Sequence, residues 1–213
     1  MATYDLEEQE QLESLKGWWK DNGNFVLTVI TVVLLVFAAW NGWNWYRGRQ
    51  SVEAASLYEV LEKASRANDL KAAREVSEQL LEKYDGTSYG TLGALVAAKM
   101  NYQAGDAKTA KAQLQWVVDH GNTDELKAIG RLRLAQVLVD EASPDEAVKL
   151  LSIAPPKGFE AAFEAARGDV LLVQNKKPEA RSAYRTALEK ADKDDQSMRQ
   201  QLQLKIDALG EGG

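Results

Sequence analysis

The sequence predicts an all-α protein: a single N-terminal transmembrane helix followed by a right-handed superhelix of about three to four helix pairs and a C-terminal capping helix. Three observations support this fold class. A long uncharged run lies near the N-terminus, short helical segments separated by turn residues fill the rest, and a pattern of small residues recurs along them.

The composition favours a folded helical protein and excludes several kinds of function. Of 213 residues, 45% are hydrophobic and 27% charged, and only 4 are proline, as expected for a globular helical chain. The absence of cysteine excludes disulfides, thiol nucleophiles and thiolate metal sites. The net charge is -6 and no basic face is apparent, so the sequence predicts no nucleic-acid binding.

The chain is predicted to divide into three regions. Residues 1–24 form an acidic N-terminal segment with six acidic side chains and two lysines, Lys16 and Lys20. Residues 25–46 form the predicted transmembrane helix, and residues 47–213 form the predicted soluble domain.

The transmembrane prediction depends on length, polarity and tryptophan placement. Residues 25–40 are uncharged but slightly fewer than the roughly 20 residues that a spanning helix needs, and residues 41–46 extend the uncharged run. The helix is apolar on every face, which argues against a buried core helix, and its long acidic leader argues against a cleaved signal peptide. The flanking tryptophans match the two aromatic belts of a spanning helix: Trp18, Trp19, Trp40, Trp43 and Trp45.

The orientation of this helix stays open on sequence grounds. Lys16 and Lys20 precede it and Arg47 and Arg49 follow it, so the positive-inside rule gives a tie. A long following domain can be translocated regardless of flanking charge. The soluble domain is therefore either exported or cytoplasmic.

From residue 51 to about residue 209 the sequence predicts roughly nine helices of 10–18 residues, separated by turn segments rich in Gly, Pro, Asn and Asp. Within them a register repeats. From Ala98, steps of 7, 5, 4 and 3 residues reach Gly105, Ala110, Leu114 and Val117. The same steps connect Ala135, Ala142, Ala147, Leu151 and Ala154, then Gly168, Asn175, Ala180, Tyr184 and Ala187, and the first three connect Leu61, Asn68, Ala73 and Ser77.

The repeat interval, 37 or 33 residues, is typical of tetratricopeptide helix pairs. Small residues at the first and third positions let paired helices approach closely, and the second position marks the turn between them. A helix near residues 195–209 would cap the open end, as solenoids require. An ordinary helical bundle without true repeats is the alternative.

Catalytic signals are lacking. The chain has none of the phosphate-binding, dinucleotide, zinc-protease or serine-hydrolase motifs, and its carboxylates mostly pair with Lys or Arg at helical spacing. The single histidine, His120, is predicted to be an exposed residue at a helix end, and the sequence predicts no metal and no cofactor. A membrane-tethered enzyme is the least favoured alternative.

Protein recognition is the predicted role, because the first helix of each tetratricopeptide pair lines the concave surface where peptides usually lie. The alternative for each residue is a solvated or packing position. The register places the following residues on that surface: Lys99, Tyr102, Gln136, Val139, Asp169 and Val173.

The whole chain resembles the ancillary SecYEG translocon subunit family of proteobacteria (YfgM type). The segments that carry the resemblance together are residues 5–10, 12–23, 88–90, 126–128, 131–135, 167–169 and 180–184.

The resemblance implies a non-enzymatic, single-pass protein of the cell inner membrane, with a cytoplasmic N-terminus and a periplasmic repeat domain. It implies the SecYEG translocon, the periplasmic chaperone PpiD and unfolded or emerging secreted polypeptides as partners, besides the lipid bilayer around residues 25–46. A cytoplasmic scaffold or regulator is the alternative function.

Overall fold

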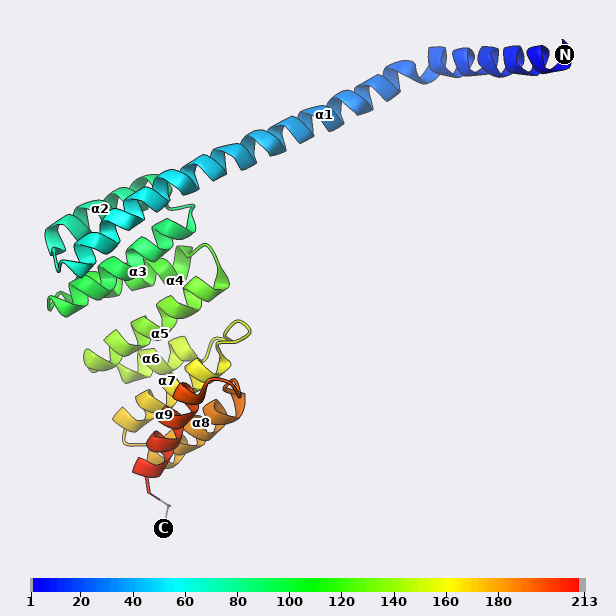
Figure 1. The fold of residues 1–213 in the computed structure, drawn as a ribbon. Coiled ribbons are helices and arrows are strands. Elements are labelled where there is room, and N and C mark those ends of the chain that lie inside the picture. The colour runs from blue at the N-terminus through cyan, green and yellow to red at the C-terminus, as the bar shows by residue number, and fades with distance from the viewer. Residues whose placement is uncertain (1, 211–213) are drawn as a thin grey trace. The chain divides into compact units, whose positions relative to one another are not determined.

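The computed structural model describes residues 2–210, with side chains from residue 10 onward. Of the predicted regions, residue 1, the side chains of residues 2–9 and residues 211–213 lie outside the described part. Figure 1 shows the helices in chain order. Their bounds are α1 Ala2–Arg66, α2 Leu70–Tyr84, α3 Ser88–Gln103, α4 Ala107–His120, α5 Asp124–Asp140, α6 Pro144–Leu151, α7 Glu160–Val173, α8 Lys177–Lys190 and α9 Gln196–Ala208.

All regular structure in residues 2–210 is helical, which confirms the predicted fold class. The chain divides into two compact units, Met1–Arg49 and Gln50–Gly213. The predicted first helix of the soluble domain is the last part of α1, because α1 continues to Arg66 without a break.

The first unit contains the apolar part of α1. Among the described helices, only this one is long and apolar enough to cross a membrane, and 6% of its most apolar window is buried. Its two threonine hydroxyls are satisfied within the helix, since Thr28 and Thr31 donate to backbone carbonyls four residues earlier at 2.7 and 2.8 Å. At its end, Arg47 and Arg49 stack on tryptophan rings.

The second unit stacks helix pairs in sequence: the end of α1 with α2, then α3 with α4, α5 with α6, and α7 with α8 (Figure 1). The register residues form the contacts within this stack. At the third position Ala73, Ala110, Ala147 and Ala180 are each at most 1% exposed. A larger side chain there would separate the helices, so these alanines explain the close pairing.

The second register position has a left-handed backbone in all four turns. The φ angles are 53° at Asn68, 84° at Gly105, 57° at Ala142 and 59° at Asn175. In each turn the next residue's N–H donates to the carbonyl five residues earlier, at 2.8–2.9 Å, as in a Schellman motif. The predicted turn position is therefore confirmed in every repeat.

One helix is shorter than predicted. α6 has 8 residues, below the expected range of 10–18, and Ala154, the fifth register position of this repeat, is exposed. Pro155 explains the early end, because its ring would clash with the carbonyl of Leu151 and it cannot donate the next helical hydrogen bond. Residues 152–159 form a loop in place of the missing turns.

The predicted capping helix is α9. Its Leu202 and Ile206 are buried against Tyr184, Ala187 and other residues of α8. This cover shields the apolar face that the last helix pair would otherwise expose.

Candidate protein-binding face

Four of the six predicted surface residues lie on two neighbouring helices. Lys99 and Tyr102 lie on α3, and Gln136 and Val139 lie on α5. Lys99, Tyr102 and Gln136 are exposed and Val139 is half-buried against the core.

A polar contact joins α3 and α5 on this face. The Tyr102 hydroxyl donates to Asp140, and the Gln136 amide donates to the same carboxylate at 3.3 Å. The hydrogen bond to Asp140 and, to a lesser degree, partial burial raise the pKa of Tyr102 above its ordinary value. Tyr102 is thus a positioned, neutral phenol with an exposed side chain, suited to contact a peptide backbone or an apolar side chain.

The two predicted residues of α7 differ from each other. Val173 is exposed together with Leu172, forming a small apolar patch at the end of the helix. Asp169 accepts hydrogen bonds from the Tyr184 hydroxyl at 2.7 Å and from Lys205 at 2.5 Å. Asp169 therefore joins α7, α8 and α9, and its carboxylate is already paired with partners inside the domain.

Successive repeats are joined by basic side chains that the repeating register of the sequence did not identify. Arg74 of α2 donates to the fully buried Asn101 at 2.7 Å and to Asp106 at 2.9 Å. Lys111, 37 residues after Arg74, pairs with Glu141 at 3.0 Å in the next repeat. Each cation reaches the turn of the following helix pair, and only the 37-residue spacing could have indicated this in advance.

The loop after α6 is also fixed to the stack. Arg131 of α5, which is buried, donates to the Ile153 carbonyl at 3.2 Å, and its guanidinium carbon lies 5.0 Å from the Phe163 ring centroid. A hollow of about 470 Å³ adjoins it, lined partly by Ile153, Pro155 and Pro156. Apolar and basic groups meet there, a mixed surface of the kind that protein ligands use.

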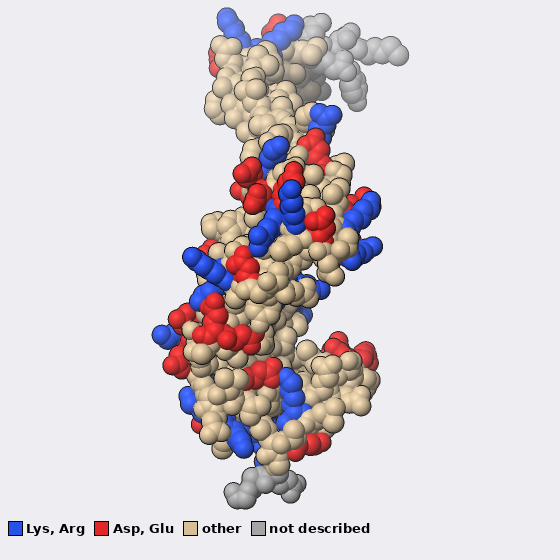
Figure 2. Space-filling model, turned by 90° about the vertical axis from the view of Figure 1, so that its left-hand side faces the viewer, with Lys and Arg blue, Asp and Glu red and all other residues tan. Residues whose placement is uncertain are grey.

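The charges along the repeats are mixed in sign. On the face drawn in Figure 2, blue and red side chains alternate over the helix pairs instead of gathering by sign. His120 is exposed at the end of α4, as predicted, and its ring stacks on Trp116 with the centroids 5.4 Å apart. Over the described residues no group of three or more His, Asp or Glu side chains is arranged to hold a metal ion.

Comparisons with known proteins agree with the helix-pair architecture. The model of the tetratricopeptide repeat-like domain family matches residues 16–211. A protein of Neisseria gonorrhoeae named ancillary SecYEG translocon subunit is 27% identical over 96% of this chain and 98% of its own length.

Two further relatives carry the same name. The one from Aggregatibacter actinomycetemcomitans is 27% identical over 97% of this chain and 99% of its own length. The one from Escherichia coli is 33% identical over 57% of this chain and 58% of its own length. The resemblance drawn from sequence segments is thereby confirmed.

Proposed function

The chain belongs to the tetratricopeptide repeat-like domain family, and from this premise we propose that it is an ancillary subunit of the SecYEG translocon that binds proteins and catalyses no reaction. One observation carries the proposal: the similarity to translocon subunits runs through both units. It covers 96% of this chain and 98% of the Neisseria gonorrhoeae relative, so the aligned region includes both the apolar helix and the repeats of this chain.

The apolar helix supports a membrane anchor. We assign residues 1–24 to the cytoplasm, residues 25–46 to the span and residues 47–213 to the periplasm, at the inner membrane. At 1.5 Å per residue the 22 residues of the span measure about 33 Å, which matches the hydrocarbon core. Tethering keeps the repeats at the membrane surface, which raises their effective concentration at a translocon exit.

The repeats support recognition of polypeptides. Tyr102 and Gln136, held by Asp140, present polar groups on α3 and α5, and Val173 presents an exposed apolar side chain on α7. Mixed signs of charge along the stack favour clients of varied sequence over one strongly charged ligand. Lys99, Tyr102, Gln136, Val139, Asp169 and Val173 are the proposed contact residues, and PpiD and emerging secreted chains the proposed partners.

Topology is tested by fusing alkaline phosphatase after Gly213 of the full chain. Because this enzyme is active only after export, we expect activity from the fusion and no fluorescence from a matched green fluorescent protein fusion. An inactive phosphatase with a fluorescent counterpart would overturn the periplasmic assignment. It would favour the second candidate, a cytoplasmic scaffold or regulator, which the tie in flanking basic residues leaves open.

Partner binding is tested with a photo-crosslinking amino acid placed at Tyr102 in the full-length, membrane-inserted protein. We expect adducts with translocon subunits, PpiD or secreted chains. The same group at Lys108, exposed on α4, is the matched control and should give far fewer of them. Adducts equal at both positions, or adducts with none of these partners, would contradict the proposal.

A further inference from the structure

The part of α1 before the membrane segment carries two separate faces. At 100° per residue, Leu12, Leu15, Trp18 and Trp19 fall within an arc of about 120°. The five charged residues of the same stretch fall within a different arc of about 140°: Glu10, Glu13, Lys16, Lys20 and Asp21. Residues 10–21 therefore form an amphipathic helix, whereas residues 25–40 are apolar all round.

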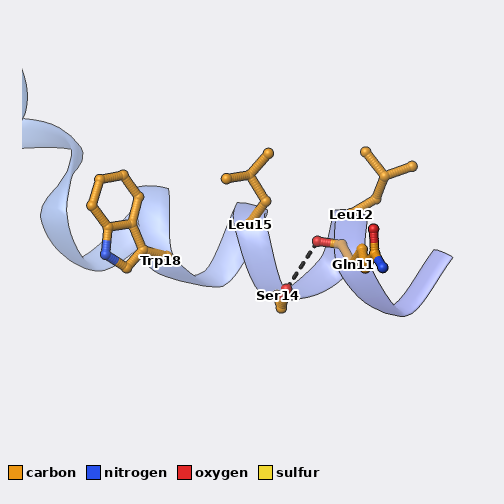
Figure 3. A pocket seen from close by; sticks show the side chains of 5 residues that line it. All are labelled: Gln11, Leu12, Ser14, Leu15 and Trp18. Carbon is orange, nitrogen blue, oxygen red and sulfur yellow. Dashed lines mark hydrogen bonds between the residues drawn. The ribbon is translucent and has the colours of Figure 1, made fainter. Parts of the chain in front are cut away.

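The apolar face is open to its surroundings. Leu12, Leu15, Trp18 and Trp19 are 54%, 60%, 52% and 49% exposed. Figure 3 shows Leu12, Leu15 and Trp18 projecting on one side of the helix, with Ser14 on the other, where its hydroxyl donates to the Gln11 carbonyl at 2.9 Å.

We propose that residues 10–21 lie along the bilayer surface, with Leu12, Leu15, Trp18 and Trp19 inserted at the boundary between lipid headgroups and acyl chains. The proposal rests on the membrane anchoring proposed above. It gives the chain a second lipid contact, in the plane of the membrane, directly before the spanning helix.

Two observations select lipid as the occupant of this face. First, the face is continuous with the spanning segment, since Phe25 follows Asp21 by four residues, so the bilayer is already within its reach. Secondly, two of its four members are tryptophans, which favour the membrane interface because their rings are apolar while the indole N–H stays hydrated.

The turn from the surface to the crossing direction has a suitable place in Asn22-Gly23-Asn24. Glycine has the weakest helix propensity of any residue except proline, so the helix bends most readily at Gly23. The Trp19 indole packs over this glycine, where an added Cβ would lie 3.2 Å from its Nε1.

The charge of the segment also defines what kind of lipid contact this is. Residues 10–21 hold three acids and two bases, a net charge of −1. Attraction to anionic headgroups therefore contributes nothing, and apolar burial drives insertion. Neutral phosphatidylcholine and mixed phosphatidylethanolamine–phosphatidylglycerol bilayers should hold the helix equally well.

The test uses the full chain, which has no native cysteine, reconstituted in nanodiscs of each lipid composition. Single substitutions Leu12→Cys and Leu15→Cys report on the apolar face, and Glu13→Cys and Lys20→Cys are the matched controls on the polar face. A nitroxide attached to each is measured by electron paramagnetic resonance for collisions with oxygen, which partitions into lipid, and with a water-soluble nickel chelate.

We expect the oxygen-to-nickel collision ratio to be several-fold higher at Leu12 and Leu15 than at Glu13 and Lys20. The apolar-face labels should lie roughly 5–10 Å below the headgroup boundary in both lipid compositions. Equal ratios on the two faces would overturn the proposal. So would protection of the apolar face that arises only when purified translocon is added, because the occupant would then be a protein.

Labels at Ile30→Cys and Val33→Cys separate this failure from failure of the membrane anchor. If both show deep lipid exposure while the two faces of residues 10–21 give equal ratios, only the surface helix is wrong. If neither enters lipid, the anchoring on which the proposal rests fails as well.

Discussion

At the scale of single residues, side-chain volume at the first register position is complemented at the fourth, 16 residues later. A large residue at one is matched by a small residue at the other, and all are buried. In the last repeat the fit is tight, because a Cβ on Gly168 would lie 2.4 Å from Tyr184 Cε1. The four pairs are Leu61 with Ser77, Ala98 with Leu114, Ala135 with Leu151, and Gly168 with Tyr184.

Gly168→Ala should destabilise the domain by about 1–3 kcal/mol, because the buried Tyr184 ring has no room to move aside. Adding Tyr184→Leu recreates the Ala–Leu pair of the two preceding repeats and should recover part of that loss. Chemical denaturation of the two single variants and the double variant gives the coupling energy. Strictly additive losses would show that volume complementarity does not operate here.

The turn residue Ala142 is the one alanine among the four left-handed turn positions, with φ at 57°. A left-handed conformation costs an L-residue about 1–2 kcal/mol, which glycine avoids. Ala142→Gly should therefore stabilise the protein by about 1 kcal/mol, measured by chemical denaturation.

The control for this turn is Ala104→Gly, at the helix end where φ is -80°. Glycine relieves no strain there and enlarges the freedom of the unfolded chain, so this variant should lose stability by about 0.5 kcal/mol. Stabilisation of both variants, or of neither, would mean that strain at Ala142 is not the cause.

At the scale of helices, the residues that precede α4 and α8 have the same backbone conformation, but only the residue before α4 caps its helix with a side-chain hydrogen bond. Asp106 caps α4 by accepting from the Thr109 N–H at 3.1 Å, with φ -90° and ψ 67°. Lys176 precedes α8 with φ -92° and ψ 65° and makes no side-chain cap bond. The geometry that a capping carboxylate needs is therefore already present at Lys176.

Lys176→Asp should stabilise the protein by about 1 kcal/mol through a new N-cap hydrogen bond and a negative charge at the positive end of the helix. Lys177→Asp is the control, because it introduces the same charge inside the first turn without the capping geometry. The midpoint temperature of thermal unfolding should be highest for Lys176→Asp, intermediate for Lys177→Asp and lowest for the parent chain. Equal gains would assign the whole effect to charge.

Helix positions could be predicted from the sequence where the cause is local. The four turn positions, the buried alanines and the capping helix all follow from residue type and spacing. The early end of α6 follows from Pro155, yet the length range of 10–18 residues assigned to the helices of the whole region overlooked it, although the predicted number of helices was right. The continuity of α1 through Arg66 was not foreseen, since the sequence was divided by polarity and helices continue across polarity changes.

The contacts of the candidate face were harder to predict because they are long-range. Tyr102 and Gln136 were selected by register, but the carboxylate that joins them, Asp140, was not. Asp169 was selected as a surface residue, whereas its partner Lys205 comes from α9, 36 residues later in the chain. Register shows which way a side chain points along one helix and says nothing of a distant helix that meets it.

At the scale of the whole molecule, each helix pair of the repeat unit packs chiefly on its neighbours, so stability is transmitted along the stack. The stability of the last pair therefore depends on what covers its free face. At the C-terminal end α9 covers Ala180, Tyr184 and Ala187 of α8, and its own Leu202 and Ile206 are buried in return. Loss of this cover exposes the apolar face of the last pair to water.

Truncation of the full chain after Ala191 should therefore unfold it locally from the C-terminal end. Amide hydrogen exchange followed by mass spectrometry should show faster exchange in α7 and α8 and unchanged exchange in α2 and α3, since nearest-neighbour coupling weakens with distance. The double variant Leu202→Ala/Ile206→Ala should give the same gradient in weaker form, with α9 still present. Uniformly faster exchange throughout the repeats would mean that the unit folds as one cooperative body, and the nearest-neighbour description would be wrong.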